Sequence, residues 1–307
     1  MQTASTEPAI DVAHIAKRYR DVEAVSDITL HVERGTIFGF LGPNGAGKTT
    51  SIKLLLGLTK PTGGAGAVLG RPLGDIAARN KIGYLPELFR YHDWMTAREE
   101  LAFHAGFLEI APRDRKRAID ESLDLVGLAE RGNHRIGTYS KGMQQRVGLA
   151  VALLGSPDLV FLDEPTSALD PIGRIDVREI VRALKVRGAT VFLNSHLLGE
   201  VEMVCDRVAI VNRGRIVAQG STAELIGASH GVRIVVSPNG VAIDPILQRY
   251  GNPSADGDWI SIEGATRDVI PALVRDLVGA GAAIYAIEAS TRTLEQRFME
   301  VLGVDAR

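Results

Sequence analysis

Cysteine and aromatic residues are scarce in this chain of 307 residues. Its one cysteine is Cys205, so no disulfide can form within the chain, and a reducing compartment is expected. Neither sign of charge dominates, because 35 Lys and Arg residues stand against 37 Asp and Glu residues. No basic tail or stripe stands out, so the sequence does not predict a nucleic-acid partner.

A long hydrophobic run is also missing. The longest apolar stretch, VGLAVALLGSPDLVFL, is interrupted by Ser156, Pro157 and Asp158. It is shorter than the roughly 20 apolar residues that a helix needs to cross a bilayer. The opening segment MQTASTEPAIDVAH lacks the basic and apolar parts of a signal peptide. We therefore expect a cytoplasmic chain that is soluble by itself and reaches a membrane only through a protein partner.

The order of the predicted elements indicates two α/β domains. Short strand-like runs fill residues 9–41, helical periodicity dominates residues 96–154, and the apolar strands LVFLD and ATVFLNS come later. A break at GASHG follows, and beyond it strand and helix signals alternate again. The expected domains are therefore residues 8–226 and a small accessory α/β domain over residues 231–307.

The glycine-rich segment GPNGAGKTT matches the phosphate-loop pattern G-x-x-x-x-G-K-[ST], between the strand TIFGFL and the helix TTSIKLLLGL. Glycines let backbone N–H groups surround an anion, and the helix amino end adds free N–H donors. A plain glycine turn would not need Lys48, which can reach the β- and γ-phosphates, or Thr49, whose hydroxyl can ligate Mg²⁺. The predicted ATP-binding residues of the loop are Gly42, Pro43, Asn44, Gly45, Ala46, Gly47, Lys48, Thr49 and Thr50.

A second motif, LVFLDEP, places two carboxylates, Asp163 and Glu164, after an apolar strand. Parallel sheets bind ligands at the carboxyl ends of their strands. By itself the pair also fits a merely solvated strand end, but a phosphate loop requires an acidic Mg²⁺ partner from another strand. We therefore predict that Asp163 holds Mg²⁺ and that Glu164 orients and polarises the attacking water.

With these motifs in this order, residues 9–225 resemble the nucleotide-binding domains of ABC transporters. The phosphate loop and LVFLDEP correspond to that family's Walker A and Walker B motifs, and YSKGMQQR resembles its signature sequence. SALD resembles the D-loop, and NSH resembles the segment of the switch histidine. The resemblance implies an α/β P-loop NTPase fold, with a RecA-like core, an N-terminal antiparallel β subdomain and a helical signature subdomain.

The resemblance also implies an ATP-dependent homodimer. Two copies face each other head to tail, and each ATP is held by Walker A of one copy and by Ser140 and Gly142 of the other. Asp170 of the D-loop joins this nucleotide-binding set, His196 would serve in catalysis at the γ-phosphate, and Tyr19 would stack on adenine. Each role has a plainer alternative: Ser140 as a helix N-cap, His196 as a packed surface histidine, and Tyr19 as an aromatic packed on the sheet.

Two features depart from the family pattern. The signature carries Lys141 and Met143 where the family usually has glycine and glutamine, and Glu87 stands at the position of the Q-loop glutamine. A carboxylate at Glu87 can still approach Mg²⁺, so we count it as a predicted metal ligand beside Asp163 and Thr49, although it adds negative charge near the phosphates. Both variations resemble those of bacterial export-type ABC ATPases, and the tail segment RTLEQRFMEVL resembles their C-terminal extension.

What the resemblance implies about function is an ATP-binding and ATP-hydrolysing subunit, with Mg²⁺ as cofactor. It would power export by a separate integral membrane permease, bound at the cytoplasmic face of the membrane. One alternative is a soluble ABC ATPase that acts on ribosomes or DNA, but the chain has one Walker A motif and no long heptad run. Another alternative makes the tail a ligand-sensing module that regulates the ATPase, although no binding residues stand out in it.

The segment LFRYHDWMT gathers Phe89, Tyr91 and Trp94 in a chain that is only 5% aromatic. One interpretation is that these rings pack inside the helical subdomain. The other is that they line an exposed groove, because aromatic residues are enriched where partners dock. In the family that the chain resembles, this region receives a short cytoplasmic helix of the membrane subunit.

Overall fold

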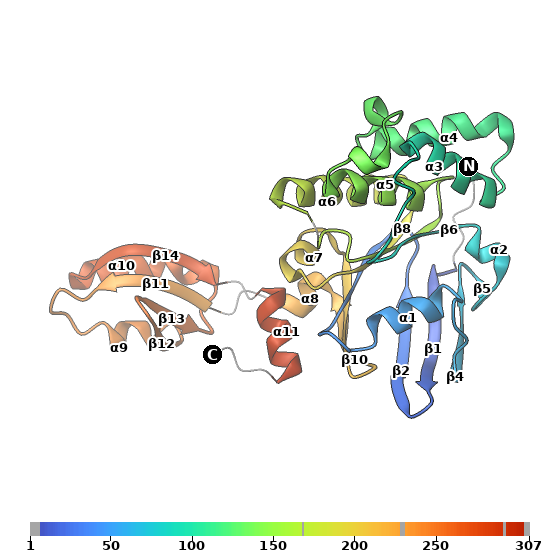
Figure 1. Ribbon diagram of the computed structural model, residues 1–307. Coiled ribbons are helices and arrows are strands. Elements are labelled where there is room, and N and C mark those ends of the chain that lie inside the picture. Colours follow the sequence, from blue (N-terminus) through green and yellow to red (C-terminus); the bar gives the residue numbers. More distant parts are fainter. Residues whose placement is uncertain (1–6, 168, 228–230, 291–292, 304–307) are drawn as a thin grey trace. The chain divides into compact units, whose positions relative to one another are not determined.

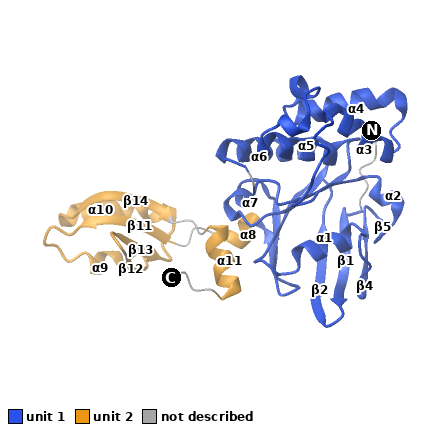
Figure 2. Ribbon diagram, viewed as in Figure 1, with its two compact units in different colours: residues 1–221 blue, residues 222–307 orange. Residues whose placement is uncertain are grey.

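A computed structural model describes residues 7–167, 169–227, 231–290 and 293–303 (Figure 1). The chain forms two compact units, residues 1–221 and 222–307 (Figure 2). This division gives helix α8 (Thr222–Ile226) to the second unit. The break expected at GASHG includes residues 228–230, which lie outside the described residues. Within the described ranges, no helix is both long enough and apolar enough to cross a bilayer.

In its described residues, the first unit is built on a mixed sheet with the strand order β5-β4-β1-β2-β10-β9-β3-β8-β7-β6. The strands are β1 (Ile10–Tyr19), β2 (Val22–Val32), β3 (Ile37–Leu41), β4 (Gly63–Val68), β5 (Arg71–Pro72), β6 (Ile82–Leu85), β7 (Leu159–Asp163), β8 (Thr190–Asn194), β9 (Arg207–Asn212) and β10 (Arg215–Ser221). The helices are α1 (Lys48–Leu55), α2 (Ile76–Arg79), α3 (Ala97–Phe107), α4 (Pro112–Leu125), α5 (Lys141–Leu153), α6 (Pro171–Val186) and α7 (Leu198–Val204).

The parallel part of this sheet positions the ends of three buried strands side by side. Strands β3, β8, β7 and β6 are parallel neighbours, and every residue of β3, β7 and β8 is buried. Such strands read as continuous apolar runs because both faces of the sheet are covered. The register pairs Asn194 with Phe40 on one side and with Asp163 on the other. Residues that follow these strands therefore meet at one edge of the sheet.

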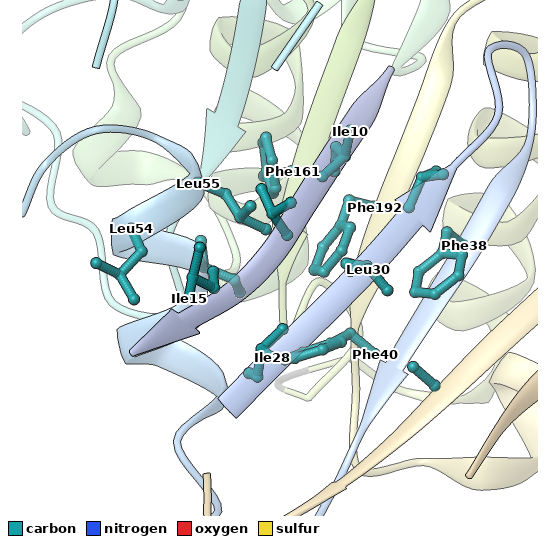
Figure 3. Close-up of a cluster of buried hydrophobic side chains, with 14 of the residues drawn as sticks. Ile10, Ile15, Ile28, Leu30, Phe38, Phe40, Leu54, Leu55, Phe161 and Phe192 are labelled. Carbon is teal, nitrogen blue, oxygen red and sulfur yellow. The ribbon is translucent and has the colours of Figure 1, made fainter. Parts of the chain in front are cut away.

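The antiparallel part consists of β1, β2, β4 and β5, with β1 between β2 and β4. Ile10 and Ile15 of β1 and Ile28 of β2 belong to one buried cluster with residues of the parallel strands and of α1 (Figure 3). Three phenylalanines link the parallel strands within it: the ring centroid of Phe192 lies 5.2 Å from that of Phe40 and 5.0 Å from that of Phe161. One core thus fixes both parts of the sheet.

Helices α3, α4 and α5 gather at one end of the first unit (Figure 1). Thr96 is the N-cap of α3 and forms a capping box. Its side chain accepts from the backbone N–H of Glu99, and the side chain of Glu99 accepts from the backbone N–H of Thr96. The N-cap of α5 is Ser140, whose side chain accepts from the backbone N–H of Met143. These features confirm the predicted P-loop fold, with an antiparallel β part and a helical part.

The second unit carries a four-stranded antiparallel sheet in its described residues, with the order β12-β13-β11-β14. Its elements follow one another as β11 (Gly231–Ser237), α9 (Asp244–Leu247), β12 (Asn252–Asp256), β13 (Trp259–Glu263), α10 (Ile270–Ala280), β14 (Ala283–Ser290) and α11 (Leu294–Leu302). From β11 to β14 this is the β-α-β-β-α-β arrangement of ferredoxin-like folds. Val232, Ile262 and Leu273 lie in its own hydrophobic core. The second unit therefore has a definite topology within its described residues.

Candidate functional site

The phosphate loop joins β3 to α1 and lies tightly against neighbouring backbone. Gly47 has a φ of +99°, in the left-handed region that favours glycine. A Cβ atom at Gly47 would lie 2.4 Å from the carbonyl oxygen of Ala24, and one at Gly42 would lie 2.3 Å from that of Val211. Glycine is therefore required at both positions by close packing as well as by backbone conformation at Gly47.

Lys48 begins α1 with its side chain turned back onto the loop. Its ammonium Nζ donates to the carbonyl oxygens of Gly42 at 2.7 Å and Pro43 at 3.2 Å, and only 8% of the residue is exposed. Burial lowers the pKa of Lys48, and nearby carboxylates oppose this shift. Those carboxylates belong to Glu164, Asp163 and Glu87. The structure thus brings the loop lysine and the predicted acidic residues into one electrostatic site.

Asp163 is the last residue of β7 and is 1% exposed. Its carboxylate oxygen Oδ1 accepts a hydrogen bond from the amide Nδ2 of Asn194, at the end of β8. Burial raises the pKa of Asp163, and the bond from Asn194 partly offsets that shift. Asn194 was not among the sequence-predicted site residues. Its signal was a polar amide that closes an otherwise apolar strand next to the switch histidine.

Glu164 and His196 form a direct pair at the same edge. The carboxylate Oε2 of Glu164 lies 2.7 Å from the ring Nδ1 of His196, and an ionised carboxylate only accepts, so Nδ1 is the donor. Glu164 has a φ of +53°, which is uncommon for a residue other than glycine and is typical of functional sites. Burial raises the pKa of Glu164, while His196 and Lys48 partly oppose that shift. The pair is therefore held in a defined, partly desolvated geometry.

The predicted signature residues lie at the start of α5, whose main neighbours are β6, α3 and α4. The Ser140 side chain caps the helix through a 3.3 Å bond from the N–H of Met143. One contact here was not predicted from the sequence: Gln145, buried within α5, donates through Nε2 to the carbonyl oxygen of Pro165 at 3.0 Å. This bond ties the signature helix to the segment directly after Glu164.

The remaining predicted residues are placed as follows. Asp170 caps α6, because its Oδ1 accepts from the backbone N–H of Gly173 at 2.8 Å, whereas Ala168 of the same D-loop segment lies outside the described residues. Tyr19 ends β1 with 44% of its surface exposed and the Lys17 ammonium 4.9 Å from its ring centroid. The exposed residues of the predicted set also include Asn44, Gly45, Thr49 and Glu87.

The aromatic segment divides between interior and surface. Phe89 contacts Tyr91 with 5.1 Å between ring centroids, and burial raises the pKa of the Tyr91 hydroxyl. Trp94 is 69% exposed, and α3 adds two further exposed rings, Phe103 at 46% and Phe107 at 69%. Phe89 and Tyr91 therefore pack inward, as the first interpretation expects, whereas Trp94 faces outward, and partner docking at this segment stays a prediction.

The fold and the geometry of the site define a P-loop nucleotide-binding cassette. The model of the ABC transporter family matches residues 25–167. An uncharacterized ABC transporter ATP-binding protein of Synechocystis is 40% identical over 303 residues, which cover 95% of this chain and 84% of that protein. The chain therefore belongs to the ABC transporter ATP-binding proteins.

The chain is also similar to a named export protein and to a solved structure. The Nod factor export ATP-binding protein I of Burkholderia thailandensis is 37% identical over 228 residues, which cover 74% of this chain and 75% of that protein. A solved ATP-binding subunit of an ABC transporter superposes with a TM-score of 0.64 at 28% identity, covering 88% of this chain and 99% of that chain. The Synechocystis and solved-structure matches cover more of the chain than the cassette does, so the similarity reaches into the second unit.

Proposed function

We propose that this chain is the ATP-hydrolysing subunit of an exporter whose membrane-spanning permease is a separate chain. The observation that carries the proposal is the convergence of Lys48, Asp163, Glu164 and His196 at the carboxyl ends of the buried parallel strands. These residues come from three separate segments of the sequence, yet each is close enough to influence the charge of another. A phosphate-binding cation beside two carboxylates is the arrangement that phosphoryl transfer to water requires.

The residues present fit a nucleotide with Mg²⁺. The described residues contain no group of three or more His, Cys, Asp or Glu side chains that could hold a metal by themselves. Mg²⁺ at nucleotide sites is instead held by one or two carboxylates, water and the phosphates. The Asn194 oxygen Oδ1, buried and without a hydrogen-bond partner, leaves an acceptor for such a hydrated ion. The residues proposed to hold Mg²⁺ are Thr49, Asp163 and Glu87.

Glu164 is proposed to activate the attacking water. When bound, Mg²⁺ neutralises charge on the β- and γ-phosphates. Glu164 is proposed to accept the proton of the water: burial raises the pKa of its carboxyl, as suits a general base, and the contact with His196 Nδ1 orients it. His196 holds Glu164 in this orientation and is proposed to lie beside the γ-phosphate of bound ATP. Lys48 exchanges its two loop carbonyls for phosphate oxygens.

The second part of each ATP site is proposed to come from another copy of the chain. Ser140 and Gly142 lie at the amino end of a helix of 13 residues, which offers N–H donors and a positive dipole end to an anion. Asp170 is proposed to approach the nucleotide from the D-loop, and Tyr19 supplies an exposed ring for adenine. This arrangement supports a homodimer with two ATP molecules between its subunits.

The membrane partner is proposed to dock on the aromatic surface, which we define as Trp94, Phe103 and Phe107. All three side chains are exposed, and solvent-exposed aromatic clusters favour protein contacts. The segment that carries Leu88 and Trp94 directly follows Glu87, so closure of the nucleotide site is coupled to the docking surface by the chain itself. Similarity to a protein named for Nod factor export supports export, with the chain at the cytoplasmic face of the membrane.

The test is hydrolysis by the full chain with Mg²⁺ and ATP. The Glu164→Gln variant should bind ATP as well as the wild type and turn over about 10²–10⁴-fold more slowly, because a positioned base typically contributes that factor. The Lys48→Ala variant should instead weaken nucleotide binding. Turnover by Glu164→Gln close to that of the wild type would exclude Glu164 as the base, and a wild-type chain that binds no ATP would exclude the proposed function.

A further inference from the structure

The side chain and backbone of Asn194 engage both acidic residues of the site. Its amide Nδ2 donates to the carboxylate of Asp163, and its backbone carbonyl accepts from the N–H of Glu164 at 2.9 Å. Asn194 is 2% exposed, so neither group is accessible to bulk water. It therefore fixes the relative position of the two carboxylate-bearing residues from the neighbouring strand.

The other half of the Asn194 amide has no partner. Its oxygen Oδ1 is buried without a hydrogen bond, whereas buried polar atoms in folded proteins are nearly always paired. The nearby ammonium of Lys48 already donates to the carbonyls of Gly42 and Pro43. The preceding residues of β8, Thr190–Leu193, are buried too, so an apolar side chain at position 194 would satisfy the fold without leaving an acceptor unpaired. The unpaired oxygen lies beside Asp163, a predicted Mg²⁺ ligand. A hydrogen-bond donor that arrives with bound Mg²⁺ and ATP would explain it.

We infer that Asn194 is a positioning residue for Mg²⁺, which orients Asp163 through Nδ2 and accepts through Oδ1 a hydrogen bond from a water molecule in the Mg²⁺ hydration shell. The inference rests on the proposed function, because it assumes that ATP and Mg²⁺ bind here. Mg²⁺ keeps several of its waters in protein sites, and these waters are strong donors. Partners that orient metal ligands in this way typically contribute about 10–100-fold to metal affinity.

The experiment measures metal binding directly. The full chain is kept in excess over a non-hydrolysable ATP analogue, Mn²⁺ replaces Mg²⁺, and free Mn²⁺ is followed by electron paramagnetic resonance. Asn194→Leu, which keeps the volume but removes both polar groups, should bind Mn²⁺ about tenfold more weakly than the wild type. The affinity for the nucleotide in EDTA should stay unchanged. Asn194→Ser, a smaller and polar replacement, serves as a second variant should Asn194→Leu fail to fold.

The matched control is Thr190→Val, at the opposite end of the same strand. Thr190 is 1% exposed and accepts from the N–H of Gly35 at 3.0 Å, so its replacement removes a side-chain hydrogen bond of a buried residue at the end of β8 away from Asp163. Thr190→Val should bind Mn²⁺ like the wild type. Mn²⁺ affinity within twofold of the wild type in the Asn194 variants would overturn the inference. A wild-type chain that binds neither the analogue nor Mn²⁺ would instead overturn the proposed function.

Discussion

At the scale of single residues, Asp163 and Glu164 are charged groups in poorly solvated positions. Burial raises the pKa of both carboxyls, and the contacts with Asn194 and His196 only partly offset it. A carboxyl whose folded-state pKa is raised contributes stability below its unfolded-state pKa, and this contribution is lost as the pH rises through the folded-state pKa. Ionisation of these groups at neutral pH therefore acts against folding.

Replacing Asp163 by Asn tests this sign. We expect the nucleotide-free Asp163→Asn variant to melt at a higher temperature than the wild type at neutral pH. Asparagine has nearly the shape of aspartate, so the replacement removes the buried charge and keeps the packing. The difference should shrink as the pH falls into the acid range, where Asp163 is protonated in both states. Calorimetry over a pH series measures both trends. The exposed Asp21→Asn substitution is the control and should leave the melting temperature nearly unchanged.

A lower melting temperature for Asp163→Asn across the whole pH range would contradict this expectation. It would mean that the hydrogen bond that Asp163 accepts from Asn194 stabilises the fold by more than the burial of the charge destabilises it. If Asp163 holds Mg²⁺, the melting temperature of Asp163→Asn with ATP should no longer rise when Mg²⁺ is added.

At the residue level, the sequence predicts site residues where chemistry follows fixed spacing, and the structure brings Lys48 and Asp163 close together, while their roles stay predictions. Lys48 and Asp163 lie in short motifs whose residue types and order are dictated by phosphate and Mg²⁺. Gln145 and Asn194 were missed because their contacts join segments distant in the sequence, such as the bond from Gln145 to the Pro165 carbonyl. A glutamine in a helix and an asparagine at a strand end have many ordinary roles, so neither residue type reveals its partner without the fold.

At the scale of elements, the segment before α3 combines an inward and an outward part. Glu100 of α3 is 2% exposed, and His92 Nδ1 lies 3.1 Å and His104 Nε2 3.4 Å from its carboxylate. The Tyr91 ring meets that of His104 edge-on, with 6.1 Å between centroids. This packing fixes the base of the aromatic surface, and Trp94 projects from it with 69% of its surface exposed.

Alanine at Tyr91 and alanine at Trp94 should therefore have different effects. Tyr91→Ala removes a largely buried ring and should cost about 2 kcal/mol of stability, which lowers the melting temperature by about 4–8 °C. Trp94→Ala should leave the melting temperature unchanged and abolish co-purification with the permease. Thermal melts and a pull-down of the native complex distinguish the two. Normal permease binding by Trp94→Ala would remove Trp94 from the docking surface.

The elements that could be predicted from sequence are those with long periodic patterns or clear caps. The capping box at Thr96 begins α3, and Ser140 begins α5, both as residue type suggests. Strand β5 covers only Arg71–Pro72 and helix α2 only Ile76–Arg79, so neither is long enough to show a period. The topology of the second unit was also beyond prediction, since pairing order depends on contacts between strands distant in the chain.

At the scale of the whole molecule, the proposed function requires a second copy of the chain to supply the signature residues of each ATP site. The Glu164→Gln variant, which retains ATP, should run as a dimer with ATP and mainly as a monomer without nucleotide. Light scattering measures the mass in each state. Glu164→Gln combined with Ser140→Ala, which lacks the hydroxyl at the start of α5, should dimerise more weakly. A monomer at saturating ATP and high protein concentration would argue against the shared site.

The second unit has a consequence for how such chains diversify. The first residue of β11, Gly231, pairs with Ser290 at the end of β14, so the ferredoxin-like sheet begins and ends at adjacent points. The helices that flank this sheet in sequence, α8 and α11, contact each other within the unit. A segment with neighbouring ends can be inserted, deleted or exchanged by one recombination event without separating the helices that bracket it. The geometry of its ends therefore allows the sheet to be replaced as one segment while α8 and α11 stay in contact.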